Sequence, residues 1–184
     1  MQLEIAEVKS PIGTLAVVVR EGKLCRLEFD NRWTRIQRDL ERRFGAVTLK
    51  KTADPAGIVS RLKAYLKGDL KALESIKVDP GGTEFQQEVW KRLRRVKPGR
   101  TVSYGELAGM IGRPRAVRAV GGANGANPVP IVVPCHRVIG ADGALTGFGG
   151  GMSRKEWLLR HEQAPFRPRS KGKKRQAALP FASS

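Results

Sequence analysis

Two kinds of hydrophobic pattern divide this chain. Residues 2–29 contain three strand-like runs, LEIAEV, TLAVVV and LCRLEF, which the turn sequences SPIG and REGK separate. Farther along, apolar residues recur at helical spacing in residues 32–45 and 55–68 and again in the second half. Strands that precede helices predict an α+β fold, with an N-terminal three-stranded antiparallel sheet plus helices and a mostly helical C-terminal part.

A stretch rich in Pro and Gly, SIKVDPGGTE at residues 75–84, separates the two parts of the chain. It predicts an N-terminal domain over residues 1–81 and a second domain over residues 82–163. Residues 164–184 carry six basic side chains and no acidic one. Such a composition buries little apolar surface, so we expect these residues to form a disordered basic tail.

The second half contains the outline of a helix-turn-helix. Ser103 and Glu106 have capping-box spacing, a Gly-containing turn follows at residues 112–114, and a second helix is expected over residues 114–123. This second helix mixes arginines with small residues. Such a helix either approaches a polyanion closely or packs tightly against a neighbouring helix, and the pattern alone does not decide between the two.

The net charge of +18 favours a polyanionic partner. The excess is spread along the chain, at +5 in residues 1–81, +7 in residues 82–163 and +6 in residues 164–184. This spread favours nucleic-acid binding over a merely well-solvated surface. The chain has no apolar run long enough to span a membrane and no recognisable targeting segment, so we expect a cytoplasmic protein.

The chain has two cysteines, Cys25 and Cys135, which lie far apart in the sequence. This spacing fits reduced thiols better than a disulfide. Cys25 lies within a strand-like run and is expected to be a small buried side chain. With two histidines in the chain, a metal site would need carboxylates, so we expect neither a metal nor another cofactor.

Cys135 differs from Cys25 because His136 follows it directly, in the sequence IVVPCHRVIG. A thiol attacks as its thiolate, so a nucleophilic cysteine needs a nearby base or positive field. Neighbours on a strand point to opposite sides, so His136 would need a bend or a bridging water to reach the thiol. Glu162 is the acid that could orient the imidazole, with Glu156 earlier in the same helix. The glycine-rich residues 141–153 form either a lid over the cysteine or a plain linker.

The segments TVSYGELA, RAVGGANGANPVPIVVPCHRVIG and GALTGFGGGMSRKEWLLRHE together resemble the O6-alkylguanine-DNA alkyltransferases, densely over residues 83–163. The first half matches that family mainly in outline, as its RNase H-like domain would. The resemblance implies a winged-helix-like second domain that binds the minor groove of DNA and flips the target base. It implies irreversible, single-turnover transfer of the alkyl group of O6-alkylguanine, with O4-alkylthymine as a second candidate substrate, to a cysteine of the protein.

The resemblance also implies residue roles. Cys135 would be the nucleophile, His136 its base acting through water, Glu162 the residue that orients His136, and Asn127 the brace of the turn before the active-site strand. The implied DNA- and base-binding residues are Ser103, Tyr104, Arg118, Arg137, Val138, Phe148 and Gly149. Among them, Tyr104 would contact the target phosphate and the flipped guanine, and Arg118 would fill the vacated stack. Phe148 stands where many relatives have tyrosine and keeps the apolar wall without the hydroxyl, while Gly149 replaces a residue with a side chain. These two positions bear on the substrate range more than on activity.

The expected partner is double-stranded DNA with an alkylated guanine, bound by a monomer. The tail sequence QAALPF also resembles peptides that bind bacterial sliding clamps, through Gln176, Leu179 and Phe181, and a merely solubilising tail is the alternative. Two other function classes remain open. A non-enzymatic binder of alkyl lesions would carry another residue at the position of Cys135. A papain-like hydrolase would separate its cysteine and histidine widely and would turn over.

Overall fold

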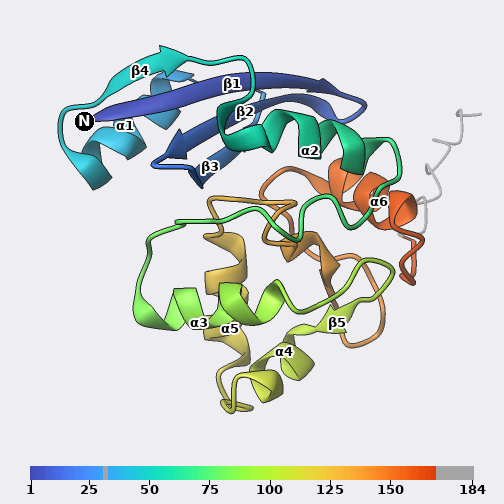
Figure 1. Cartoon of the computed structure of the whole chain (residues 1–184). Coiled ribbons are helices and arrows are strands. Elements are labelled where there is room, and N and C mark those ends of the chain that lie inside the picture. The colour runs from blue at the N-terminus through green and yellow to red at the C-terminus, as the bar shows by residue number, and fades with distance from the viewer. Residues whose placement is uncertain (31–32, 169–184) are drawn as a thin grey trace, which may run out of the picture.

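The computed structural model describes residues 1–30 and 33–168. A sheet with two helices forms the upper part of the molecule in Figure 1, and a group of short helices forms the lower part. The last helix, α6 (Met152–His161), lies beside α2 (Ile58–Leu66) near the junction of the two parts. The architecture is therefore α+β, as the hydrophobic patterns predict. In the described part of the chain, no helix is both long and apolar enough to cross a membrane.

The sheet has four strands in the order β3-β2-β1-β4. The antiparallel meander expected for residues 2–29 is present as β1 (Gln2–Ser10), β2 (Gly13–Arg20) and β3 (Lys23–Phe29). The fourth strand, β4 (Thr48–Lys51), pairs parallel to β1 and was not predicted. Its sequence TLKK is polar and lies at an edge, so it lacks the apolar alternation by which strands are recognised.

Both faces of β2 are buried, because successive side chains of a strand point to opposite faces. Ala16 and Val18 pack with Ile36 of α1 (Trp33–Phe44) on one face. Val17 and Val19 belong to a second cluster, which continues through α2 into the helices of the second half. The sheet is thus enclosed between α1 and the rest of the protein, and the two halves share one continuous core.

The helices of the second half are α3 (Glu84–Leu93), α4 (Tyr104–Met110) and α5 (Val117–Gly125), followed by α6. Thr83 caps α3 and Ser103 caps α4, each through a complete capping box. The capping predicted for Ser103 is therefore present. The second helix of the helix-turn-helix begins at residue 117 and not at 114, because residues 113–116 form a separate turn closed by the Ala116 N–H and the Arg113 carbonyl (2.9 Å).

Backbone hydrogen bonds tie the outer strand of the sheet to the segment that precedes α3 and to a loop of the second half. Leu24 of β3 donates to the Lys77 carbonyl (2.9 Å), and its own carbonyl accepts from Asp79 (2.9 Å). Three residues farther along, Leu27 donates to the carbonyl of Pro128, in the loop that leads to the Cys-His pair (2.9 Å). The sheet therefore fixes the position of that loop.

The first residues of the predicted tail pack against the body, which differs from the disorder expected from residue 164 onward. Ala164 is buried at 6% exposure, and the Arg167 N–H donates to the Gly143 carbonyl (2.7 Å). The Pro165 carbonyl also accepts a hydrogen bond from the Thr101 hydroxyl (3.0 Å). These contacts with distant parts of the chain hold the residues that follow α6 in place despite their polar composition. Gln176, Leu179 and Phe181 lie outside the described residues.

Candidate active site around Cys135

Cys135 opens a 3-10 turn, η2 (Cys135–Arg137), directly after Pro134. Its backbone N–H donates to the Val133 carbonyl (2.8 Å), and the buried side-chain amide of Asn124 reaches the Cys135 carbonyl at 3.5 Å. Neighbouring side chains on a strand would point apart. The two residues lie in a tight turn and not on a straight strand, so the bend that the sequence requires between them is present.

Asn127 holds the loop that leads into this turn. Its side-chain N–H donates to the Val133 carbonyl (2.8 Å), and its Oδ1 accepts from the backbone of Val129 (3.0 Å). The same loop holds Ile131 at φ 73, a left-handed conformation that β-branched residues rarely adopt. Such strain persists where the surroundings over-determine the backbone. The structure thus places Asn127 at the turn that the sequence interpretation assigned to it.

His136 is fully buried and lies beside Glu162, with Nε2 3.0 Å from Oε1. A carboxylate accepts hydrogen bonds, so Nε2 carries the proton in this contact. Burial lowers the pKa of His136, although the nearby Glu162 acts in the opposite direction, so the neutral ring is favoured. The other nitrogen, Nδ1, is buried and has no hydrogen-bond partner among the described residues. In this tautomer its lone pair is available to accept a proton.

Glu162 is held by more donors than the sequence suggested. Arg137 grips both of its oxygens, with Nε 2.9 Å from Oε2 and Nη2 2.8 Å from Oε1. The hydroxyl of Tyr65, from α2 in the first half, donates to Oε1 at 2.6 Å. Burial opposes ionisation, but hydrogen bonds and charges from His136 and Arg137 hold the pKa of this carboxyl below its usual range. The other candidate acid, Glu156, lies at the surface and pairs with Arg160 (2.7 Å).

The position of Arg137 differs from the sequence prediction, which placed this residue among the DNA- and base-binding groups. Its side chain is 7% exposed, and besides Glu162 it bonds the Val96 carbonyl. All of these contacts lie within the protein. A buried carboxylate needs a paired charge, and Arg137 supplies it.

Lys155 is a buried cation that the sequence interpretation missed. Its Nζ donates to the carbonyls of Val138 (2.5 Å) and Thr146 (3.0 Å), and burial lowers its pKa to about 8. It thereby joins α6 to the chain after η2 and to the glycine-rich loop. The sequence does indicate its burial, because Lys155 lies on the same helical face as the buried Leu158 and Leu159. Val138 itself is buried, and its carbonyl is engaged by Lys155.

Cys135 is 5% exposed, and burial raises the pKa of its thiol to about 11. Three influences act against burial: a hydrogen bond from the Asn127 side chain, the charge of Lys155 and backbone N–H groups of the turn. The site thus holds a protonated thiol at rest, together with groups that stabilise its thiolate. Proton removal is therefore the step for which a base such as His136 is needed.

A cavity of about 270 Å³ opens beside Cys135. Phe148 and Gly149 of the glycine-rich loop form one wall, and Asn127 and Phe29 contribute to others. The rings of Phe29 and Phe148 meet edge to face, 5.9 Å between centroids. A Cβ at Gly150 would come within 2.5 Å of the Phe29 ring and 2.7 Å of the Phe148 ring, so a residue without a side chain suits this contact. The loop therefore lies over the cysteine as the wall of a pocket.

Five of the predicted DNA- and base-binding residues lie outside this cavity lining, the buried Arg137 and Val138 described above and also Ser103, Tyr104 and Arg118. Tyr104 begins α4, and its hydroxyl lies 3.1 Å from the Thr146 hydroxyl of the glycine-rich loop. Ser103 uses its side chain to cap α4. Arg118 is exposed on α5. The structure thus connects Tyr104 with the wall of the pocket, whereas Arg118 faces outward from a neighbouring helix.

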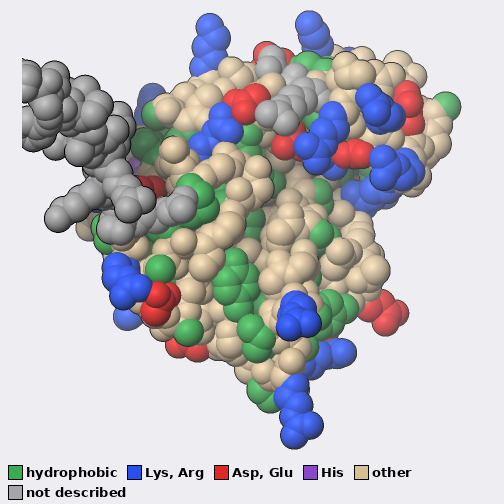
Figure 2. Space-filling view, turned by 180° about the vertical axis from the view of Figure 1, so that it is seen from behind, with side chains coloured by type: hydrophobic (Ala, Val, Ile, Leu, Met, Phe, Trp, Pro, Cys, Tyr) green, Lys and Arg blue, Asp and Glu red, His purple; other side chains and the backbone are tan. Residues whose placement is uncertain are grey.

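The exposed face of α5 is lined by small residues and arginine. A side chain at Gly122 or Gly125 would meet nothing within 4 Å, so these glycines are not required by packing inside the protein. Gly121 is different, because it faces the Tyr104 ring. In Figure 2 the lower part of the molecule shows mainly backbone, uncharged and hydrophobic groups, with Lys and Arg at its lower tip. The exposed residues of this helix and the turn before it include Arg115, Val117, Arg118, Ala119, Gly122 and Gly125.

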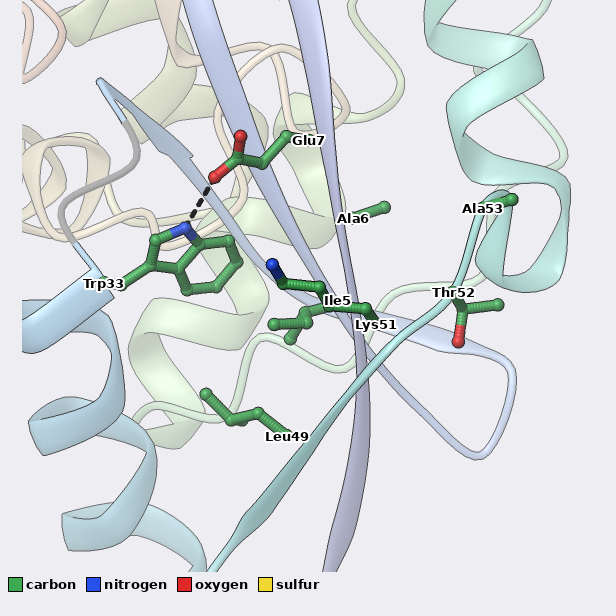
Figure 3. A pocket seen from close by; sticks show the side chains of 8 residues that line it. All are labelled: Ile5, Ala6, Glu7, Trp33, Leu49, Lys51, Thr52 and Ala53. Carbon is green, nitrogen blue, oxygen red and sulfur yellow. Dashed lines mark hydrogen bonds between the residues drawn. The ribbon is translucent and has the colours of Figure 1, made fainter.

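A larger hollow of about 610 Å³ lies in the first half, away from these residues. Figure 3 shows it between β1, β4 and the start of α1, where the Trp33 indole donates to Glu7 Oε1 (2.6 Å). Its lining has neither a cysteine nor a histidine. Size therefore does not identify the reactive pocket. The lining residues are Ile5, Ala6, Glu7, Trp33, Leu49, Lys51, Thr52 and Ala53.

Comparison with protein-family models gives two adjoining matches. Residues 6–80 match the ribonuclease-like domain of 6-O-methylguanine DNA methyltransferase. Residues 84–164 match the DNA binding domain of the same family. Together the two matches cover most of the chain.

Individual relatives match over nearly their whole length. The chain is 44% identical to a methylated-DNA–protein-cysteine methyltransferase of Salmonella typhimurium, over 85% of this chain and 93% of the relative. It is 45% identical to the protein of that name from Mycobacterium tuberculosis, over 85% and 90%. A crystal structure of the M. tuberculosis O6-methylguanine methyltransferase superposes with a TM-score of 0.74 at 41% identity, covering 88% of this chain and 93% of that one. The structure of the M. tuberculosis protein in complex with DNA gives 0.73 at 40% identity, covering 90% and 96%.

Proposed function

Because the chain belongs to the 6-O-methylguanine DNA methyltransferase family, we propose that Cys135 is the residue that takes the alkyl group from damaged DNA. The enzyme class is methylated-DNA–protein-cysteine methyltransferase, and the role is repair of alkylated DNA. The observation that carries the assignment to Cys135 is its position. It lies in the wall of a cavity and directly precedes a buried histidine that contacts a carboxylate.

The transfer forms a bond between the Cys135 sulfur and the alkyl carbon while the bond from that carbon to guanine O6 breaks. The electron pair of the broken bond stays with the guanine, which takes up one proton and becomes unmodified guanine, so the proton gained by the base balances the one lost by the thiol. The thiol proton leaves to His136 Nδ1 through a water molecule. A thioether is a poor leaving group, so water does not regenerate the thiol. Each protein molecule therefore acts once.

Three features support this assignment of roles. His136 is held with Nε2 toward Glu162, which leaves Nδ1 as the basic atom. The imidazolium that forms next to the Glu162 carboxylate is stabilised by that charge. Lys155 adds a positive charge that favours the thiolate of Cys135. The sequence interpretation anticipated the first two groups and not the third.

We further propose that α5 enters the minor groove and that the target nucleotide rotates out of the helix into the Cys135 cavity. The exposed small residues around Gly122 allow close approach to the sugar-phosphate backbone, and Arg118 stands on the same exposed face to enter the vacated stack. An O6-alkyl group lies within the stacked duplex, so a nucleophile fixed in a cavity reaches it only after rotation. Tyr104, at the start of α4, would contact the rotated nucleotide and donate to the leaving base.

Phe148 bears on the range of substrates. It provides an apolar wall without a hydroxyl, packed against Phe29. An O4-alkylthymine is smaller than an alkylated guanine and would fill this cavity less completely, so we propose that guanine lesions react faster. Single-turnover rates on matched duplexes with the two lesions measure this preference. Equal rates would show that the wall does not discriminate.

The tail proposal concerns residues outside the described part of the chain. Gln176, Leu179 and Phe181 would bind a bacterial sliding clamp as a short peptide. Deletion of residues 176–184 should abolish clamp binding in a pull-down with purified clamp and leave alkyl transfer unchanged. Clamp binding that survives the deletion would refute the motif.

The function is tested by intact-mass spectrometry after mixing the protein with a duplex that contains one O6-methylguanine. The native protein should gain one methyl group, about 14 Da, and stop at one per molecule. Cys135→Ser should gain nothing while still binding the duplex. Lesion-specific binding without any mass gain in the native protein would favour a non-enzymatic binder. Repeated turnover on a model ester would favour a hydrolase.

A further inference from the structure

The acid of the proposed site receives a hydrogen bond from the other half of the protein. Tyr65 lies at the end of α2, 97 positions away from Glu162, and its hydroxyl donates to Glu162 Oε1 at 2.6 Å. Tyr65 is 0% and Glu162 1% exposed. A phenol and a carboxylate this deeply buried form a charge-assisted hydrogen bond without competition from solvent.

We propose that Tyr65 is a positioning residue for alkyl transfer: its hydroxyl, supplied by the first half, fixes Glu162 so that Oε1 faces His136. The inference rests on the proposed function of Cys135, since it concerns the histidine that deprotonates this thiol. In the proposed role, Tyr65 contacts neither the thiol nor the DNA. It acts through Glu162.

The other donors to Glu162 do not replace the hydroxyl. Arg137 grips one oxygen with Nη2 and the other with Nε, which sets the plane of the carboxylate. The Oε1 atom that Nη2 contacts also binds His136 and Tyr65. The direction from which Oε1 meets His136 therefore depends on how Oε1 is shared among these three donors, of which Tyr65 is the nearest at 2.6 Å. Without the hydroxyl, the carboxylate is free to shift along the Arg137 fork and away from the imidazole.

Tyr65 is itself fixed by rigid elements. The ring of His161, at the end of α6, donates from Nε2 to the Tyr65 backbone carbonyl (2.7 Å). It also meets the Tyr65 ring edge to face at 5.1 Å and stacks on Trp157 at 4.8 Å. Glu162 directly follows His161, so α6 is docked onto α2 at two successive residues. A donor mounted on packed helices holds its partner more accurately than one on a loop.

The tyrosine remains a donor throughout the working pH range. Burial and the adjacent Glu162 both raise the pKa of Tyr65 well above that of a free phenol. The hydroxyl therefore keeps its proton and does not add a second negative charge beside the carboxylate. A neutral donor of this kind orients the carboxylate without neutralising its charge.

The test compares Tyr65→Phe with the native full-length protein in two assays. The first is the single-turnover rate on the O6-methylguanine duplex. The second is the pH dependence of Cys135 alkylation by iodoacetamide without DNA, read from the mass of the Cys135 peptide. We expect Tyr65→Phe to slow the transfer about tenfold, within the range of a general-base contribution, and to move the alkylation profile to higher pH. DNA affinity should change less than about twofold, because Tyr65 is fully buried on α2 and is not part of the exposed face of α5.

Cys25→Ala is the matched control, since it also removes a buried hydrogen bond of the first half, from the Cys25 thiol to the Val18 carbonyl (3.3 Å). It should lower the melting temperature without moving the profile of Cys135. In a Glu162→Gln background, Tyr65→Phe should have no further effect on that profile, because the carboxylate to be oriented is gone. A Tyr65→Phe rate and profile equal to those of the native protein, or a shift to lower pH, would overturn the proposal. If instead the native protein transfers no methyl group, it is the proposed function that fails.

Discussion

The two cysteines lie in regions that are alike in burial and different in everything around them. Cys25 in β3 is 1% exposed and Cys135 in η2 is 5% exposed. Burial raises the pKa of each thiol to about 11. Cys25, however, donates to the Val18 carbonyl inside the sheet, whereas Cys135 lines a cavity and precedes a histidine. Burial and pKa alone therefore do not distinguish a reactive thiol from a packed one.

The two regions differ in the buried polar groups that act on the cysteine sulfur. Around Cys135, the side chains of Asn127 and Lys155 both favour the thiolate. Near Cys25, the charges of Arg43 and Asp79 act in opposite directions. Buried polar groups cost free energy unless they are paired. Their concentration near Cys135, and the conventional apolar packing of Cys25, support the proposal that Cys135 is the reactive cysteine.

The largest effect should come from removing the carboxylate behind His136. Glu162→Gln leaves Arg137 without its buried counter-charge and His136 without the group that stabilises its protonated form. We expect the single-turnover rate to fall about 100-fold or more. The free energy of unfolding should drop by roughly 3 kcal/mol, measured by urea denaturation.

The matched control is Glu156→Gln, an acid in the same helix that pairs with Arg160 at the surface. Both the rate and the free energy of unfolding should stay near those of the native protein, because exposed pairs contribute little. Equal losses in the two variants would show that the acid acts only as part of helix α6.

A smaller effect should follow from filling the exposed face of α5. Gly122→Leu meets nothing within 4 Å in the protein, so its melting temperature should be unchanged or higher. If α5 approaches DNA closely, the added side chain should raise Kd for the duplex roughly tenfold, which fluorescence anisotropy measures. Gln37→Leu, an exposed apolar substitution on α1, should leave Kd unchanged. Unaltered affinity of Gly122→Leu would place the DNA elsewhere.

The sequence predicted the local features of this site better than the long-range ones. The capping of α4 by Ser103 depends on neighbouring residues, and so does the position of His136 directly after Cys135 in one turn. Tyr65 and Glu162, in contrast, meet only because α2 and α6 pack together in the folded protein. Arg137 was misassigned to DNA because an arginine next to the reactive residue has no local sign of being buried. Periodicity likewise missed β4, which pairs at an edge through its backbone.

Lys155→Met tests the buried charge near the thiol. Removal of this charge should raise the pKa of the Cys135 thiol. A rise of about one unit lowers the thiolate population about tenfold, and the rate of transfer should fall by the same factor. Lys91→Met, at an exposed lysine of α3, should leave the rate unchanged. A rate unaffected by Lys155→Met would mean that the charge serves only to hold the glycine-rich loop.

Comparison of Lys155→Met with the native protein should also reveal a pH dependence of the free energy of unfolding. Burial lowers the pKa of Lys155 from 10.5 to about 8, so the unfolded chain binds this proton more tightly than the folded one. The free energy of unfolding of the native protein should therefore rise by roughly 3 kcal/mol, relative to Lys155→Met, as the pH increases from about 8 to about 10.5. The thiols titrate in both proteins and largely cancel in this difference. A difference that stays constant over this range would contradict a buried ammonium group.

The smallest effect on transfer should come from Cys25→Ala. This thiol makes one hydrogen bond within the sheet, so its loss should lower the free energy of unfolding by about 1 kcal/mol. The single-turnover rate should change by less than about twofold, since the site around Cys135 is untouched. A large loss of rate would remove the contrast between the two cysteines.

Peptide mapping of the protein after reaction with an O6-methylguanine duplex tests whether Cys135 is the residue that takes the alkyl group. Digestion followed by tandem mass spectrometry assigns the methyl group to one peptide. We expect S-methylcysteine at Cys135 and unmodified Cys25 in every reacted molecule. Methylation of Cys25, or repair of the duplex without a methyl group on Cys135, would contradict this assignment.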